Sequence, residues 1–351
     1  MIKKSLYDIS WQVSEEKYRE NSALSYSMIA KYAREGFKTL FDTKKIDTSS
    51  LRFGSLVDCL LTEPETFEDR FIVIDMKIPS DTIVLILEQI YESLQIKTPN
   101  IYEVPEEVIF DFIEKNEYGA SWLRQTRINK ILTSGASYFK SLFDKDGKIA
   151  ILQTDYDDAQ NCVLELENNP YTANFVNNPN LDYIEDLHQT KFIMTNPYKV
   201  RCMFDKIRVD HQKKLIYPMD YKTTFDSEEN FNHSFKQWRY DIQANLYSYI
   251  LQEICKKDEY FKDFKIMPFQ FIVISRTTKS PIIWKFITTN EVLVEPSYKQ
   301  INNFGIEIPH WETYLHEMNY YFNIQSTRYS KNTIESNGTR MLDSLTLNRD
   351  I

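Results

Sequence analysis

The sequence predicts a mixed α+β fold, in which helices flank a central mixed sheet and a largely helical part precedes it. Two patterns indicate this. Through about residue 175 the apolar side chains recur mainly at helical spacing, whereas between 183 and 288 short apolar runs alternate with turn residues. We therefore expect a helical N-terminal part over 1–175, integrated with a catalytic core over 176–325. A tail over 326–351, rich in Ser, Thr, Asn and Arg, is expected to be disordered.

The N-terminal part contains three helical stretches. Helices are expected over residues 25–40, 50–61 and most of 81–170. The second should end before Glu63-Pro64, because the residue before a proline is disfavoured in helical conformation. The third should be broken at Thr98-Pro99-Asn100 and near Gly147.

The core alternates strands with helices. Strands are expected over residues 183–194, 199–209, 215–223, 268–275 and 282–288. The first two are joined by a turn at Asn196-Pro197, and the next two by a short polar loop at His211–Lys214. Helices are expected over 228–254 and 311–322.

Cysteine and glycine exclude several kinds of site. The four cysteines are scattered and form no CxxC pair, so we expect reduced, buried thiols and neither a zinc site nor an iron–sulfur cluster. The seven glycines are not spaced as GxGxxG or GxxxxGK[ST], so no nucleotide cofactor is expected.

Charge and hydropathy limit the cellular setting and the partners. The N-terminus does not resemble a signal peptide and the apolar runs are too short to cross a bilayer, so we expect a cytoplasmic protein with no membrane partner. The net charge of −9 is unlike that of most nucleic-acid-binding domains. It leaves a DNA partner open, because a carboxylate metal site adds acid that bound cations offset locally.

Two aspartates face each other across the second hairpin of the core. If its loop is centred between Gln212 and Lys213, Asp205 lies opposite Asp220, with Cβ atoms roughly 4.5–5.5 Å apart. Like charges at that separation are destabilising unless a cation lies between them, and carboxylate oxygens are ligands that Mg²⁺ prefers. Strict alternation places Asp205 in a row with four other side chains, Arg201, Met203, Ile207 and Val209.

A lysine shares the face of the second aspartate. Lys222 is two residues beyond Asp220 on the same strand, so both side chains project to one side. The Asp-x-Lys tripeptide is weak alone, because four other copies begin at Asp42, Asp75, Asp146 and Asp263. Only the Asp220 copy lies on an expected strand with an opposed aspartate. The alternative is a surface hairpin with incidental charges.

The helix after this hairpin adds two polar side chains. Gln243 and Tyr247 are four residues apart and therefore share a helical face. A packed core aromatic is the alternative for Tyr247. A glutamine on a helix that packs over the strands is less readily explained as core.

This order of features resembles the PD-(D/E)xK nucleases, in their RecB-like and phage exonuclease branch. A strand aspartate, a hairpin, Asp-x-Lys and a helix with QxxxY are most similar to the exodeoxyribonuclease VIII (RecE-like) nuclease domain. The segment Phe53–Pro64 is similar to that family's G-S-x-x-H-x-x-x-x-x-P motif, and the resemblance covers about residues 22 to 290. It implies a central sheet of the restriction-endonuclease-like type.

The resemblance also implies roles for particular residues. Asp205 and Asp220, with the backbone carbonyl of Tyr221, would ligate Mg²⁺, for which Mn²⁺ would substitute. Asp58 stands where relatives often carry His and would be a further ligand, and Glu185 is a weaker one. Lys222 would orient the attacking water and stabilise developing negative charge. Gln243 and Tyr247 would position the DNA backbone.

Two arginines are further candidates for a DNA phosphate. Arg34 and Arg52 lie on expected helices of the N-terminal part, although such side chains usually face water.

The implied activity is a double-strand DNA exonuclease of phage or prophage recombination. Such an enzyme would act on duplex ends in a bacterial host cytoplasm, as a ring-shaped oligomer paired with a single-strand annealing protein. An endonuclease on the same fold is the nearest alternative. From another class, the alternative is a DNA-binding or host-interaction protein whose nuclease site has lapsed.

Overall fold

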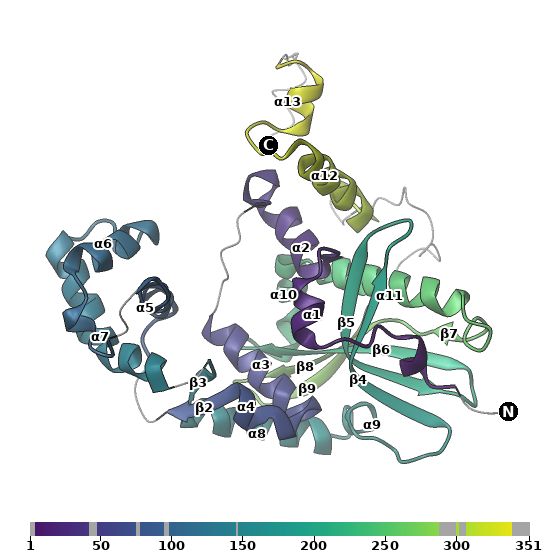
Figure 1. Ribbon diagram of the computed structural model, residues 1–351. Helices are drawn as coiled ribbons and strands as arrows, with labels where there is room; N and C mark the ends of the chain where they lie inside the picture. The colour runs from purple at the N-terminus through teal and green to yellow at the C-terminus, as the bar shows by residue number, and fades with distance from the viewer. Residues whose placement is uncertain are drawn as a thin grey trace.

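A seven-stranded mixed sheet lies at the centre of the computed structural model, which describes residues 4–41, 48–74, 78–94, 98–144, 147–287, 300–301 and 307–338. Its main path has the order β1-β5-β6-β8-β9, with β4 added to β5 and β7 to β6. The strands are β1 (Leu24–Ser25), β4 (Ile184–Met194), β5 (Val200–Asp210), β6 (Leu215–Thr224), β7 (Lys265–Ile266), β8 (Gln270–Ser275) and β9 (Pro281–Lys285). Parallel and antiparallel pairs both occur, and helices lie on both faces (Figure 1), which confirms the predicted fold class.

The β5–β6 hairpin has the predicted register and then opens. Its described ladder runs from Asp210↔Leu215 to Lys206↔Met219, so continuation by one step would bring Asp205 opposite Asp220. Beyond that point β6 pairs on its other edge with β8, and the start of β5 pairs with β1. The two aspartates therefore lie where the strands begin to separate.

The face that β5 turns to the core changes at Asp205. Five of its side chains lie in one core cluster, namely Val200, Cys202, Phe204, Ile207 and Val209. Strict alternation, which we had expected to place Arg201 and Met203 with Ile207 and Val209, is therefore wrong. Across the ladder at the same level, Gln189 has a positive φ of 47° and distorts β4 between the pairs His188↔Lys206 and Thr190↔Phe204.

Helices α2, α11 and α12 pack with one face of the sheet, and α3 and α8 with the other. The N-terminal elements are η1 (Leu6–Ile9), α1 (Glu15–Glu20), α2 (Tyr26–Glu35), η2 (Phe37–Thr39), α3 (Ser49–Thr62), η3 (Pro64–Thr66) and α4 (Phe67–Arg70). Those that follow are α8 (Gln153–Asn168), α9 (Ala173–Val176), η5 (Glu228–Asn230), α10 (Phe231–Trp238), α11 (Tyr240–Lys256), β10 (Gln300–Ile301), β11 (Glu307–Ile308) and α12 (Trp311–Ile324).

A helical lobe stands apart from the sheet (Figure 1) and has a hydrophobic core of its own. It consists of α5 (Asp81–Ser93), η4 (Ile101–Glu103), α6 (Glu106–Lys115) and α7 (Arg124–Asp144). Two short parallel strands, β2 (Phe71–Ile74) and β3 (Ile149–Leu152), connect it to the rest of the chain. The stretch 81–170 is thus mostly helical as predicted, but the strand β3 within it was not expected.

Two helical predictions need correction. The helix expected over 228–254 is interrupted at Arg239, whose φ of 56° and ψ of 46° end α10 and begin α11. The segment after Ser326, expected to be disordered, includes the short helix α13 (Lys331–Glu335), because Ser330 caps it and the Lys331 amide donates to the Tyr321 hydroxyl at 2.6 Å. The tail from residue 339 and the expected strand end at Thr288 lie outside the described residues.

Two other expectations concern the cysteines and the membrane. All four cysteines are buried and free, as predicted. Among the described residues, no helix is long and apolar enough to span a bilayer.

A buried lysine fixes β5 beside the distortion. Lys206 is 1% exposed, and its ammonium group lies 2.6 Å from the Val176 carbonyl oxygen and 2.9 Å from Asp186. Arg208 also donates to Asp186, at 2.6 Å. Because a buried charge is costly unless it is paired and hydrogen-bonded, these contacts must be kept for β5 to hold its place.

We expect Lys206→Ala to lower the free energy of unfolding by about 3 kcal/mol, because it removes one partner of a buried ion pair. Urea denaturation measures this change. The control is Lys213→Ala, whose side chain is 69% exposed and whose ion pair is worth at most about 1 kcal/mol. Equal effects of the two substitutions would contradict a structural role for Lys206.

Candidate active site

The end of β6 carries the aspartate and lysine that share a face. Asp220 is 3% exposed, and the Lys222 ammonium group donates to its Oδ2. From α11, the Gln243 amide donates to Oδ1 at 2.6 Å. Both oxygens of Asp220 are therefore held, one by a strand residue and one by the helix above.

Asp205 reaches the same place from β5. Its Oδ2 accepts a hydrogen bond of 2.9 Å from the backbone amide of Tyr221, the residue between Asp220 and Lys222. The structure thus brings together Asp205, Asp220, Lys222 and Gln243, as the hairpin register and the helical spacing predicted.

Asp58 is delivered by α3, which runs close to β6. A Cβ atom at Gly54 would lie 3.3 Å from the Thr223 Oγ1, so a glycine lets the helix approach the strand. Asp58 lies one turn further along α3, where Gln189 donates to both of its carboxylate oxygens, at 3.3 and 3.1 Å. Asp58 is near enough to Asp220 and Lys222 to interact with both electrostatically.

The electrostatics show an excess of negative charge. Burial and the neighbouring Asp220 raise the pKa of Asp58 to about 6. Burial, Asp220 and Asp58 raise the pKa of Asp205 well above its usual range. Although burial opposes it, Asp220 raises the pKa of Lys222. Three carboxylates thus surround one ammonium group, an arrangement that a further cation would stabilise.

The donor atoms suit a hard divalent cation. Carboxylate oxygens are the ligands that Mg²⁺ takes, and the buried Oε1 of Gln243 has no hydrogen-bond partner among the described residues. As they stand, however, no three Asp, Glu, His or Cys side chains of the described ranges are arranged to hold a metal ion. Lys222 and Gln243 contact both oxygens of Asp220, so a cation bound there would have to replace the Lys222 contact.

Glu185, the weaker candidate ligand, lies elsewhere. It pairs with Val209 on β5, four residues from Asp205, which is roughly 13 Å along a strand. There it accepts hydrogen bonds from Ser5 and from the Leu6 amide at 3.2 Å, and lies 3.3 Å from His211. Glu185 therefore fixes the N-terminal segment instead of joining the acidic cluster.

Tyr247 lies beneath the cluster in an aromatic layer. Its ring is 5.1 Å from that of Phe204 and 6.1 Å from that of Phe269. Burial raises the pKa of its hydroxyl. These contacts make Tyr247 a packing residue below Asp205 and Asp220, and a direct role toward DNA stays a prediction.

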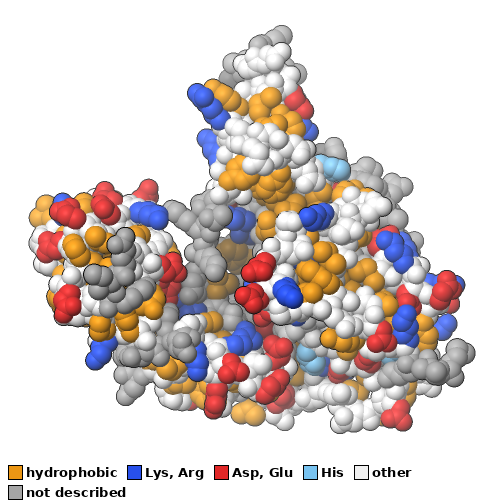
Figure 2. Space-filling model, viewed as in Figure 1, with side chains coloured by type: hydrophobic (Ala, Val, Ile, Leu, Met, Phe, Trp, Pro, Cys, Tyr) orange, Lys and Arg blue, Asp and Glu red, His pale blue; other side chains and the backbone are white. Residues whose placement is uncertain are grey.

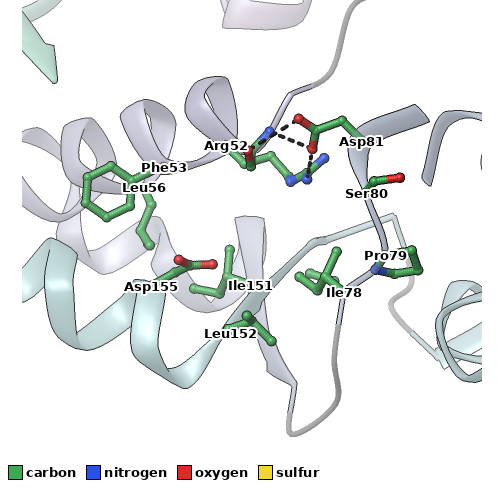
Figure 3. A pocket seen from close by; sticks show the side chains of 12 residues that line it. Arg52, Phe53, Leu56, Ile78, Pro79, Ser80, Asp81, Ile151, Leu152 and Asp155 are labelled. Carbon is green, nitrogen blue, oxygen red and sulfur yellow. Dashed lines mark hydrogen bonds and ion pairs between the residues drawn. The ribbon is translucent and has the colours of Figure 1, made fainter. Parts of the chain in front are cut away.

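The two arginine candidates lie in different places. Arg34 and Asp220 both act electrostatically on Tyr240, and the Arg34 guanidinium group lies 5.0 Å from the ring of Trp238. Arg52 is directed into a pocket of about 350 Å³ between α3 and the helical lobe (Figure 3), where Asp81 binds it at 2.9 Å. An ion pair with Asp81 therefore already satisfies part of the charge of Arg52.

Three residues near the cluster were missed from the sequence. Gln189 could have been found by extending the register argument to the β4–β5 hairpin, where it falls opposite Asp205. Tyr240 lies with its ring 4.9 Å from the Lys222 Nζ, and Tyr26 packs on Tyr240 at 6.2 Å. Neither tyrosine carries a signal in the sequence, because their positions depend on how α2 and α11 pack.

Comparisons with other proteins place the chain in a family. No curated protein matches it. A crystal structure named "Putative exonuclease" from Eubacterium rectale is similar over 97% of this chain and 94% of that chain, with 12% identity and a TM-score of 0.36. A family model described as a PDDEXK-like domain of unknown function matches residues 31–307, which is most of the chain. The chain therefore belongs to this PDDEXK-like family.

Proposed function

We propose that this protein is a metal-dependent nuclease that hydrolyses phosphodiester bonds in DNA. The observation that carries the proposal is the convergence of Asp58, Asp205 and Asp220 on Lys222 and Gln243 at the opening of the β5–β6 hairpin. Membership of a PDDEXK-like family supports it. The proposed metal is Mg²⁺, with Mn²⁺ as a substitute.

In this proposal the carboxylates of Asp58, Asp205 and Asp220 hold the cation, together with the Tyr221 carbonyl oxygen. The cation would supply Lewis-acid stabilisation of the attacking and leaving oxygens. Lys222, released from Asp220, would then place its ammonium group where negative charge develops on the phosphate. Gln243 keeps Asp220 oriented and offers its free Oε1 toward the same space.

The overall charge of the chain limits how DNA could be attracted to it. Figure 2 shows acidic and basic side chains interspersed on one face of the molecule, as expected for a chain of net charge −9. A long-range positive field is therefore a poor explanation for DNA binding, and bound cations would supply much of the local attraction.

The finer assignment is a double-strand exonuclease acting at duplex ends in phage or prophage recombination. It rests on the resemblance to the exodeoxyribonuclease VIII domain, as do a ring-shaped oligomer and an annealing-protein partner. Purified protein incubated with linear and closed-circular duplex DNA, in Mg²⁺ and in EDTA, tests it. Mg²⁺-dependent loss of linear DNA alone supports the exonuclease, and cutting of circles indicates an endonuclease. No cleavage in either Mg²⁺ or Mn²⁺ would contradict the nuclease proposal.

We expect Lys222→Ala to reduce the rate of DNA cleavage at least about 100-fold, because it removes the fixed charge at the reacting phosphate. DNA binding in a gel-shift assay should be largely kept. The matched control is Lys265→Ala, which alters the exposed lysine of another Asp-x-Lys copy. Comparable loss of binding by Lys222→Ala would contradict the catalytic assignment.

We expect Asp205→Asn to raise the thermal unfolding temperature without metal and to abolish the stabilisation by Mg²⁺. In EDTA the neutral side chain relieves repulsion with Asp220 and Asp58, so the thermal unfolding temperature should rise by about 2 °C. Added Mg²⁺ should stabilise the parent protein but not the variant. The control is Asp263→Asn, whose side chain is 64% exposed in a different Asp-x-Lys copy. Equal stabilisation of parent and variant by Mg²⁺ would rule out Asp205 as a ligand.

A further inference from the structure

Trp238 presents a large aromatic surface at the edge of the candidate active site. It is the last residue of α10, and it is 43% exposed. The exposed part of the indole is an apolar surface on which a flat ligand could stack. Its neighbours show what that ligand could be.

A cation accompanies the ring. The guanidinium group of Arg34, on α2, lies 5.0 Å from the centre of the Trp238 ring, and its Nη1 lies 3.5 Å from the Trp238 carbonyl oxygen. The nearest acid, Glu35, is 3.9 Å away. The guanidinium group therefore lies over the indole ring, so an aromatic ring and a positive charge occur together. This combination binds single-stranded nucleic acid.

Two tyrosines connect this pair to the acidic cluster. The Tyr26 hydroxyl donates to the Trp238 carbonyl oxygen at 2.9 Å, and the Tyr26 ring packs on Tyr240 at 6.2 Å. The Tyr240 ring lies in turn 4.9 Å from the Lys222 Nζ. The backbone of Trp238 is therefore connected to Lys222 through one hydrogen bond, one ring–ring contact and one cation–π contact.

The conformation that exposes Trp238 is held in place by the next residue. Arg239 has a left-handed backbone, which is unfavourable for a residue with a side chain. Its guanidinium group donates to both oxygens of Asp241 at 2.9 Å and to the Tyr314 hydroxyl at 3.0 Å. A left-handed residue commonly ends a helix, and here it fixes the direction in which the chain leaves α10 after Trp238.

We propose that Trp238 and Arg34 form a stacking platform for an unpaired base of the DNA strand that enters the site. The proposal rests on the nuclease function proposed above and names its substrate more closely, as DNA with a single-stranded or frayed end. Bases within a duplex are already stacked on each other, so only an unpaired base can cover the indole. Arg34 would contact a phosphate of the same strand.

The experiment measures binding to two DNA probes in a Lys222→Ala background, so that cleavage does not interfere. The probes are a fluorescein-labelled 12-nucleotide oligo-dT and a blunt duplex of equal length, titrated in Mg²⁺ and followed by fluorescence anisotropy. We expect Trp238→Ala to weaken oligo-dT binding about tenfold or more and duplex binding much less. Trp238→Phe should restore most of the affinity. Arg34→Gln should lower the slope of log affinity against log salt concentration by about one, the value for one phosphate contact.

The matched control is Trp122→Ala. Trp122 is 47% exposed in the helical lobe. Its removal therefore takes away a similarly exposed indole but leaves Trp238 and Arg34 in place. Unchanged oligo-dT affinity in Trp238→Ala, or equal losses with Trp122→Ala, would overturn the platform and leave the nuclease proposal standing. Equal losses on both probes would overturn the preference for an unpaired base. If the Lys222→Ala protein with Trp238 intact binds neither probe, the nuclease proposal itself fails. Thermal unfolding of each variant verifies that it is folded.

Discussion

The contact between Asp220 and Lys222 is the interaction on which the arrangement of the site depends. Asp220 is almost fully buried, and burial of an unpaired carboxylate is strongly unfavourable. Lys222 supplies the compensating charge from the same strand, and Gln243 supplies a hydrogen bond from α11. These two partners attach β6 to the helix above it. The same carboxylate repels Asp58 and Asp205. Packing of α3 and β5 against β6 therefore holds together three carboxylates that would otherwise move apart.

The separation of β5 from β6 gives these groups room. A hairpin paired to its ends would enclose Asp205 and Asp220 in a continuous ladder, whereas here the paired region stops at Lys206 and Met219. Lys206, buried against Asp186 and Val176, fixes the residue of β5 at which the pairing with β6 ends. The distortion at Gln189 turns the neighbouring strand at the same level. A structural lysine and a distorted strand therefore determine the position of the acidic cluster, although neither belongs to it.

Much of this site follows from short-range rules. The loop length of one hairpin predicted its register, and the twofold repeat of a strand placed Lys222 beside Asp220. The helical repeat placed Gln243 on one face with Tyr247, and the family resemblance brought that face to the aspartates. Errors arose where tertiary packing overrode those rules. The assignment of Glu185 took no account of distance along the strand, and strict alternation on β5 failed at the distortion, which has no glycine or proline to signal it. The break at Arg239 was missed for the same reason, because its left-handed conformation depends on Asp241 and Tyr314. Strands β2 and β3, four residues each, are too short for periodicity to separate them from the surrounding helices.

The helical lobe has a consequence for how the molecule loses its structure. Its core, which includes Ile86, Leu87, Ile109 and Phe139, is distinct from the clusters that pack on the sheet. A unit with its own core and a narrow attachment can open without disturbing its neighbour. Amide hydrogens of α5, α6 and α7 can therefore exchange through an opening that leaves β5, β6 and α11 closed.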